Sequence, residues 1–253
     1  MPPVRLLRSR AWLVGACYAS WGVFFLVGLG LNLACAPLLL LPHRARYGHR
    51  VRAVIRRLFA FWLGWFHASG VLQVVWHGFE TPLPSGCVYI ANHPTLLDAT
   101  FLLARLPEAI CIFKPALMRN PAVGPAALMG GYAAGRPGVD LVRDVAGRIA
   151  AGQSLLIFPE GTRTGPGETL GPLKPGFALI AARAHAPVQL ILIRATPGVA
   201  PRGRPWWRPP ALLPARVDLF LDRRWDHDPT CSALELTGQV ERHLLASLPP
   251  PPP

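Results

Sequence analysis

Residues 87–98 read CVYIANHPTLLD, an apolar run that passes directly into a polar turn. The first five residues are apolar on both faces, as strands buried inside a parallel sheet are. Proline is favoured at the first position of a helix, so Pro94 predicts a helix start with His93 as its cap. The stretch therefore predicts a strand, a turn and a helix. It places His93 at the carboxyl end of the strand, where open α/β sheets bind their ligands.

The same alternation of strand and helix patterns continues through most of the chain. Short apolar runs predict strands at 71–76, 87–91, 109–113, 154–158, 187–193 and 215–221. The segments between them, and one after the last, predict helices at 95–105, 115–129, 140–151, 175–185 and 232–247. We therefore expect an α/β fold with a mostly parallel central sheet covered by helices.

The amino-terminal segment has a different character. Residues 11–41 carry no charge, and about 20 apolar residues are enough to cross the hydrocarbon core of a bilayer. We expect a hydrophobic, membrane-anchoring helical segment here. A cleaved signal peptide is the alternative, because Arg5 and Arg8 precede the run, but its length favours an uncleaved anchor.

Six arginines lie between Arg44 and Arg57, and three precede the apolar run. By the positive-inside rule, this asymmetry predicts an inner (plasma) membrane protein whose main domain faces the cytoplasm. Residues 58–66, LFAFWLGWF, fit either an interfacial helix among lipid headgroups or a core helix of the domain. The expected division is an anchor and basic segment at 1–66, an α/β domain at 67–247 and a proline-rich tail at 248–253.

The composition limits the partners. The chain has 26 basic and 13 acidic residues, a net charge of +13, which favours phosphates, nucleic acid or acidic lipid headgroups. A nucleic-acid binder is a rival interpretation, but the apolar anchor and the lack of a nucleic-acid-binding motif argue against it, so no nucleic acid partner is expected. Five cysteines without C-x-x-C spacing indicate neither a disulfide framework nor a zinc site. No metal and no cofactor are expected.

A second polar cluster follows the predicted strand 154–158. Residues 158–163 read FPEGTR, and Arg163 can bind a phosphate with two parallel hydrogen bonds while Gly161 permits close backbone approach. Both clusters follow buried strands, so they are expected at one edge of the sheet. A carboxylate at Asp98 can hold one ring nitrogen of His93 and leave the other free to accept a proton.

Together, His93 with Asp98 and the run FPEGTR resemble the glycerolipid acyltransferase family typified by the 1-acylglycerol-3-phosphate acyltransferases, over roughly residues 70–200. The resemblance implies that His93 is the catalytic base and that Asp98 orients it. It also implies that the E-G-T-R residues, together with a basic residue that opens a helix, bind the substrate phosphate. These substrate-binding residues are Glu160, Gly161, Thr162, Arg163 and Lys174.

One element departs from the family pattern. The usual G-x-I-P-x-D/N-R is here Gly131-Tyr132-Ala133-Ala134-Gly135-Arg136, with no proline and no acidic or amide residue. Arg136 either reaches the substrate phosphate or is a solvated loop arginine. The departure leaves the acyl acceptor open more than acyl transfer itself.

The expected activity is transfer of a fatty acyl group from acyl-CoA or acyl carrier protein to the hydroxyl of a lysophospholipid-like acceptor in a membrane. Acylation of a non-glycerol lipid, such as an amino-acid lipid or a secondary-metabolite lipid, is an alternative. A non-catalytic protein that binds anionic membranes is another. The loop RGRPWWRPP (202–210) is either a second interfacial contact or a plain surface loop.

Overall fold

The computed structural model describes residues 9–113, 115–134, 138–196, 200–210 and 212–249. Within these ranges seven strands form one sheet, in the order β1-β7-β6-β2-β5-β3-β4. The strands are β1 (Leu72–His77), β2 (Val88–Ala91), β3 (Ala109–Phe113), β4 (Ala133–Ala134), β5 (Ser154–Ile157), β6 (Val188–Thr196) and β7 (Ala215–Trp225). The pairs are parallel except β6 with β7, which is antiparallel. The predicted α/β fold with a mostly parallel sheet is confirmed.

The centre of the sheet positions the polar turns. All four residues of β2 are buried, and β2 lies between β5 and β6 in parallel register. Ile90 pairs with Ile157, so the chain leaves β2 and β5 at the same level and on the same edge. The two clusters predicted to share an edge therefore do so. The short strand β4 and the last four residues of β7 were not predicted.

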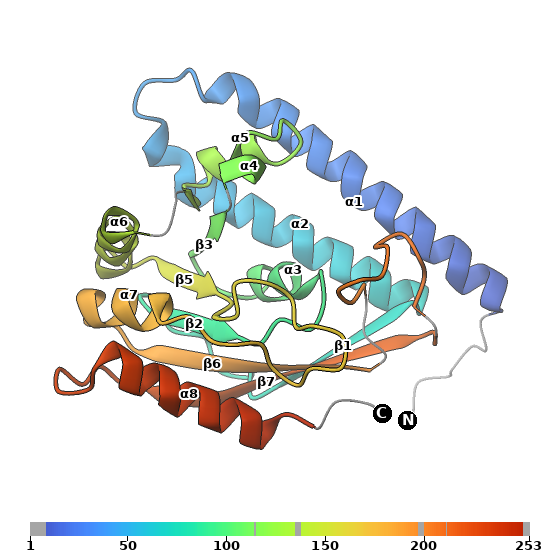
Figure 1. The fold of residues 1–253 in the computed structure, drawn as a ribbon. Helices are drawn as coiled ribbons and strands as arrows, with labels where there is room; N and C mark the ends of the chain where they lie inside the picture. Colours follow the sequence, from blue (N-terminus) through green and yellow to red (C-terminus); the bar gives the residue numbers. More distant parts are fainter. Residues whose placement is uncertain (1–8, 114, 135–137, 197–199, 211, 250–253) are drawn as a thin grey trace.

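Helices cover both faces of the sheet (Figure 1). Helices α2 and α3 lie over one face, while α7 and α8 lie over the other and α6 packs beside α7. Their bounds are α2 (Gly48–Ser69), α3 (Asp98–Leu103), α6 (Val139–Ala150), α7 (Gly176–Ala184) and α8 (Ala233–Ser247). The side chain of Ser232 caps α8, and Glu235 completes a capping box with it.

The helix predicted at 115–129 is wrong in one respect, because it is two short helices. These are α4 (Pro115–Met118) and α5 (Gly124–Met129). The Asn120 carboxamide oxygen accepts the N–H of Ala122 at 2.9 Å, and Pro121 has no N–H to donate. Both effects favour a turn over a continued helix.

The amino-terminal part forms two long helices, α1 (Arg10–Leu38) and α2, joined through a 3-10 turn (Arg44–Tyr47). Residues 58–66 form no separate helix but belong to α2. Trp62, Leu63 and Phe66 are buried in the core, while Phe61 and Trp65 are exposed. Of the two readings of this segment, the structure therefore favours the core helix. The predicted division at residue 66 falls inside α2 and stays a prediction.

Helix α1 packs along α2 and α5 and is tied to them by hydrogen bonds near both ends. The Trp12 indole N–H donates to the Ser69 carbonyl at 3.2 Å. The Asn32 carboxamide donates to the Ala122 carbonyl at 2.8 Å and accepts the Ala126 N–H at 3.0 Å. By length and composition α1 could cross a membrane. Its outer side carries exposed apolar residues, among them Tyr18, Phe25, Leu26, Leu29 and Leu33.

One arginine of the basic segment is not available to lipid headgroups. Arg52 is buried and donates from Nε to a carboxylate oxygen of Glu108 at 3.0 Å and from Nη1 to the Gly130 carbonyl at 2.8 Å. A buried guanidinium needs such partners, because an unpaired buried charge is costly. Arg52 thus joins α2 to the loops before β3 and β4.

Candidate active site

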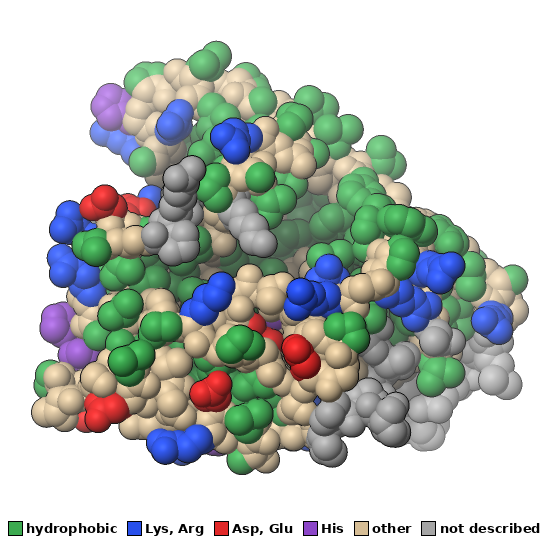
Figure 2. Space-filling view, in the orientation of Figure 1, with side chains coloured by type: hydrophobic (Ala, Val, Ile, Leu, Met, Phe, Trp, Pro, Cys, Tyr) green, Lys and Arg blue, Asp and Glu red, His purple; other side chains and the backbone are tan. Residues whose placement is uncertain are grey.

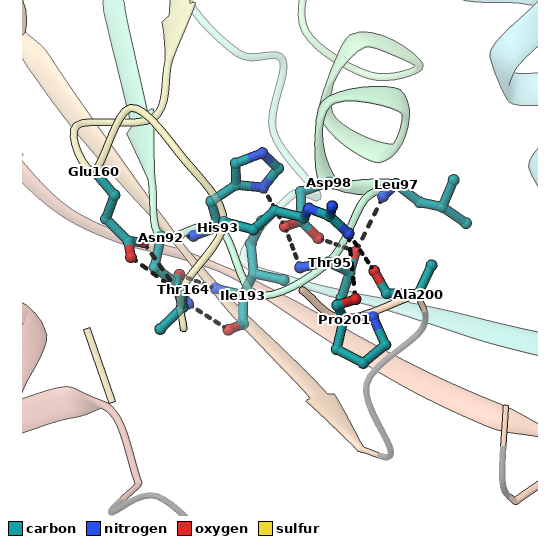
Figure 3. A network of polar contacts seen from close by, with 11 residues as sticks. Asn92, His93, Thr95, Leu97, Asp98, Glu160, Thr164, Ile193, Ala200 and Pro201 are labelled. Atoms are coloured by element: carbon teal, nitrogen blue, oxygen red, sulfur yellow. Dashed lines mark hydrogen bonds and ion pairs between the residues drawn. The ribbon is translucent and has the colours of Figure 1, made fainter. Parts of the chain in front are cut away.

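The turn after β2 is fixed by the side chain of Asn92. Its carboxamide donates to the Ile193 carbonyl at 2.9 Å and accepts the Ile193 N–H at 2.8 Å. Asn92 is buried, so a side chain here replaces the backbone pairing that β2 would otherwise make with β6. The residue that follows, His93, therefore leaves the sheet in a defined direction (Figure 3).

His93 and Asp98 are in direct contact, as expected. The His93 Nδ1 lies 2.8 Å from Asp98 Oδ2, and the Asp98 side chain is 0% exposed while that of His93 is 18% exposed. The same Oδ2 accepts the Thr95 N–H at 2.8 Å, and the Thr95 hydroxyl donates to Oδ1. Three donors thus satisfy the buried carboxylate (Figure 3).

The local structure between these two residues differs from the prediction. Pro94 does not begin a helix, and Asp98 is the first residue of α3 rather than a residue of its second turn. The reason is that the Thr95 hydroxyl accepts the Leu97 N–H at 3.2 Å while Asp98 accepts the Thr95 N–H. Side-chain acceptors take the amides that helical turns would use, so the chain forms a bend first.

Two opposing effects act on the pKa of the Asp98 carboxylate. Complete burial raises the pKa of Asp98 above its ordinary value, and the hydrogen bonds from His93 and Thr95 lower this pKa in part. The contact with Nδ1 leaves Nε2 as the nitrogen that faces away from the carboxylate. Such an imidazole can take a proton at Nε2, and the resulting cation is stabilised by the carboxylate behind it.

Phe158 holds the other side of the imidazole. Its ring stacks on that of His93 with centroids 4.1 Å apart and an interplanar angle of 18°. A stacked aromatic face restricts the tilt of the imidazole. From the sequence, Phe158 is noted only as the first residue of the run FPEGTR. Its role follows from the parallel register of β2 and β5, which the sequence could have suggested.

Glu160 points into the protein. It is 3% exposed, and its Oε1 accepts the backbone N–H of His93 at 2.9 Å while Oε2 accepts the Gly171 N–H at 2.9 Å. The hydroxyl of Thr164 also donates to it, and the Thr164 N–H donates to the His93 carbonyl at 2.9 Å. Glu160 and Thr164 therefore bind the loop after β5 to the turn that carries His93 (Figure 3).

The other residues of the motif form the outer rim. Gly161 and Thr162 are exposed, Arg163 is half-buried and Lys174 is exposed. Gly161 has a φ of 68°, and a Cβ at this position would lie 2.9 Å from Lys174 Nζ. The positive φ favours glycine here, and any Cβ would also displace the flexible Lys174 side chain. The ammonium of Lys174 and the guanidinium of Arg163 give this rim a positive charge.

Arg163 also holds the loop that enters β7. Its Nη1 donates to the carbonyls of Ala200 and Pro201 at 2.9 and 3.3 Å. Beyond Ala200, an apolar pocket is lined by residues of α1, α2, the turn after β2 and this loop, including Cys17, Phe66, Leu97 and Trp206. In the space-filling view the molecule is hollowed below α1, and hydrophobic side chains gather there (Figure 2).

One predicted residue, Arg136, lies outside the described residues. In the described ranges no group of three or more His, Cys, Asp and Glu side chains could hold a metal ion. The remaining predicted site residues lie together at the carboxyl edge of β2 and β5.

An imidazole held by a buried carboxylate, next to a positively charged rim, defines a site that can deprotonate a hydroxyl group close to an anion. Residues 73–194 match the family model described as Acyltransferase. The resemblance to 1-acylglycerol-3-phosphate acyltransferases is thereby confirmed, and the relatives below bear the name.

The chain is 35% identical over 129 residues to 1-acyl-sn-glycerol-3-phosphate acyltransferase BAT2, chloroplastic, of Brassica napus, covering 48% of this chain and 37% of BAT2. It is 25% identical over 197 residues to the LPAT1 enzyme of Arabidopsis thaliana, which has the same descriptive name, covering 72% and 53%. The chain thus spans only about a third to a half of these relatives.

The fold is similar to a solved structure over nearly its whole length. That structure is the 1-acyl-sn-glycerophosphate (LPA) acyltransferase PlsC from Thermotoga maritima, with a TM-score of 0.68 and 23% identity. The match covers 92% of this chain and 91% of that chain. At this identity the likeness establishes the fold alone.

Proposed function

We propose that this chain transfers a fatty acyl group from a thioester donor to the hydroxyl of 1-acylglycerol-3-phosphate or a closely related lysophospholipid. The observation that carries the proposal is the contact of His93 Nδ1 with the buried Asp98 carboxylate at 2.8 Å. The rim formed by Arg163 and Lys174 supports an anionic acceptor. The match to the acyltransferase family model supports the reaction class.

In the proposed reaction, Nε2 of His93 removes the proton of the acceptor hydroxyl as its oxygen attacks the thioester carbonyl carbon. The C–S bond then breaks, and the leaving thiolate takes the proton back from the imidazolium. Asp98 stabilises the imidazolium between these two steps. The acyl group moves directly, so no acyl-enzyme is required.

The rim residues have different tasks in this proposal. Arg163 and Lys174 bind the acceptor phosphate, with the backbone of Gly161 and Thr162 close to it. Glu160 contributes to substrate binding indirectly, because its carboxylate is buried, accepts hydrogen bonds from protein groups and would repel a phosphate. The hydrophobic hollow below α1 (Figure 2) suits an acyl chain. Acyl-CoA and acyl carrier protein are the two candidate donors.

We further propose that α1 enters one leaflet of the inner (plasma) membrane from the cytoplasmic side. Its hydrogen bonds to Ser69, Ala122 and Ala126 support insertion into a single leaflet, because they hold most of the length of α1 against the domain. A helix held in this way can insert its apolar outer side without crossing the bilayer. The active-site edge would then lie near the surface in which the acceptor dissolves.

The proposal is tested with purified full-length protein in detergent micelles with acyl-CoA and 1-acylglycerol-3-phosphate, by measuring thiol release and the diacyl product. His93→Ala is expected to lower kcat by about 10²–10⁴-fold, the usual contribution of a positioned base. His227→Ala, a histidine between β7 and α8, is the control and should retain activity. Equal activity of His93→Ala and the unmodified protein would exclude the proposed mechanism.

The acceptor is tested separately. Acceptors with and without a phosphate, namely 1-acylglycerol-3-phosphate and monoacylglycerol, are compared at equal acyl length. The charged rim predicts a much higher kcat/KM for the phosphate-bearing acceptor. Preference for the uncharged acceptor would support acylation of a different lipid instead.

A further inference from the structure

Residues 200–210, here called the tryptophan loop, connect the active-site rim to α1. At one end, the Ala200 carbonyl accepts a hydrogen bond from Arg163 at 2.9 Å. At the other, the Trp206 ring packs against Trp21 and Phe25 of α1, with centroids 5.0 and 5.2 Å apart. The loop is therefore held on both sides, and its outer surface has a fixed position relative to α1.

The outer surface of the loop is both aromatic and basic. Trp207 is 52% exposed. Arg208, the next residue, and Arg202 of the same loop are also exposed, and Arg202 Nη1 lies 3.5 Å from the Arg163 carbonyl. The sequence 200–210 contains three arginines and no acidic residue. Tryptophan prefers the boundary between headgroups and acyl chains, and arginines beside it meet lipid phosphates. An indole that serves only a soluble surface would gain nothing from this exposure.

This surface continues the apolar side of α1. Phe25, which contacts Trp206, is itself one of the exposed apolar residues of that helix, and Leu29 and Leu33 follow on the same side. In the space-filling view, hydrophobic side chains run along α1, and Lys or Arg side chains gather near its amino-terminal half (Figure 2). An apolar strip with a basic border is the pattern of a surface that lies in an anionic membrane.

We infer that the tryptophan loop is a second membrane-binding surface, which inserts Trp207 into the headgroup region of an anionic bilayer while Arg202 and Arg208 bind lipid phosphates. The contact does not depend on acyl transfer. It extends the contact made by α1 and places the loop that is bonded to Arg163 directly at the lipid surface. The partner of this surface is the bilayer itself, because the arginines match the layer of lipid phosphates and the apolar strip matches the acyl chains below it.

The experiment reads the environment of the loop alone, since α1 by itself can hold the protein on vesicles. Trp207→Cys is made in a Cys231→Ser background and labelled with a polarity-sensitive fluorophore. The four other cysteines are buried. Leu234→Cys in the same background is the matched control, because Leu234 is 74% exposed on α8, on the opposite face of the sheet.

With full-length protein on vesicles of phosphatidylcholine and phosphatidylglycerol, the label at 207 is expected to shift its emission to shorter wavelength and to be quenched by brominated acyl chains. The label at 234 should show neither effect. An unshifted, unquenched label at 207, or equal responses at both positions, would overturn the inference.

The basic part of the surface is tested by charge. Arg202→Ala with Arg208→Ala is expected to weaken the response of the label at 207 to phosphatidylglycerol by about fivefold for each arginine removed. Arg183→Ala with Arg242→Ala, two exposed arginines of α7 and α8, is the control and should leave that response unchanged. Equal effects of the two pairs would show that net charge, and not this loop, attracts the bilayer.

Discussion

The carboxylate of Glu160 accepts the backbone N–H of His93 at 2.9 Å, although the two residues follow different strands. The same carboxylate accepts the Gly171 N–H and the Thr164 hydroxyl. One acidic side chain thus sets the relative position of the imidazole and the charged rim. The two sequence motifs act as a unit because of this contact.

Glu160→Gln is expected to lower kcat by about 10–10²-fold with folding retained. A glutamine can accept from His93, but its NH2 group then faces the Gly171 N–H, and a buried donor opposite a donor costs about 1–3 kcal/mol. Glu168→Gln is the control, because its exposed carboxylate accepts the Gly165 N–H within the same loop and, among the described residues, makes no hydrogen bond with His93 or Gly171. Steady-state kinetics check this, and equal kinetics for both variants would contradict it.

Asp98→Asn is expected to lower kcat by about 10²–10⁴-fold, because the amide no longer stabilises the imidazolium. Its effect on stability depends on pH. Burial raises the pKa of Asp98, so the native state favours the protonated carboxyl, and the ionised form at pH 7 destabilises the fold.

The amide NH2 of the variant also faces groups that donate to the carboxylate, His93 and Thr95, and this cost does not change with the ionisation of Asp98. As the pH falls through the raised pKa, Asp98 becomes protonated in the native protein, so the Tm of the variant minus that of the unmodified protein should fall. Thermal unfolding of both proteins between pH 7 and pH 4 measures this. A difference that grows toward low pH would show that the carboxylate is stabilised by its partners more than burial destabilises it.

Arg163→Lys is expected to raise the KM for the phosphate-bearing acceptor at least about tenfold with a smaller change in kcat. An ammonium lacks the fork that binds a phosphate with two hydrogen bonds and cannot also reach the Ala200 carbonyl. Arg183→Lys on α7 is the control. A fall in kcat without a change in KM would assign Arg163 to the chemical step instead.

The cysteines are expected to differ sharply in reactivity. Burial raises the pKa of Cys87 and Cys111 to about 12, so almost no thiolate is present at pH 8. Cys17 and Cys35 lie in α1 and are buried as well, so that of the five cysteines only Cys231 is partly exposed. One thiol per chain should react quickly with a disulfide reagent in the native protein. A second fast thiol would show that the core opens readily.

Much of the site was predictable because its parts are local. The run CVYIA has the length and apolar character of a buried strand, and the four residues between His93 and Asp98 allow a turn to bring them together. The helix start at Pro94 was wrong because the prediction counted backbone preferences. It did not count the Thr95 hydroxyl, which accepts the Leu97 N–H, or the Asp98 carboxylate, which accepts the Thr95 N–H.

The rest depended on contacts between distant segments. A motif gives the types of its side chains but not their directions, so the inward position of Glu160 could not be read from FPEGTR. Trp206 packs on Trp21, which lies 185 residues earlier in the chain. Trp206 is itself part of a proline-rich segment with no periodic pattern, so no signal in the sequence predicts this contact. Likewise, Arg52 lies in the basic segment that the sequence predicts to face lipid headgroups. Its side chain is nevertheless buried, where it pairs with Glu108.

The hydrogen bonds from Trp12 and Asn32 to the body of the protein fix more than the position of a helix. Because α1 cannot slide or tilt against the domain without breaking them, the membrane contact proposed for α1 would fix the height of His93 above the lipid. The proposed acyl transfer should therefore proceed at similar rates in vesicles of short-chain and long-chain phosphatidylcholine, whose bilayers differ in thickness. A protein suspended from a freely tilting membrane-spanning segment would not share this indifference.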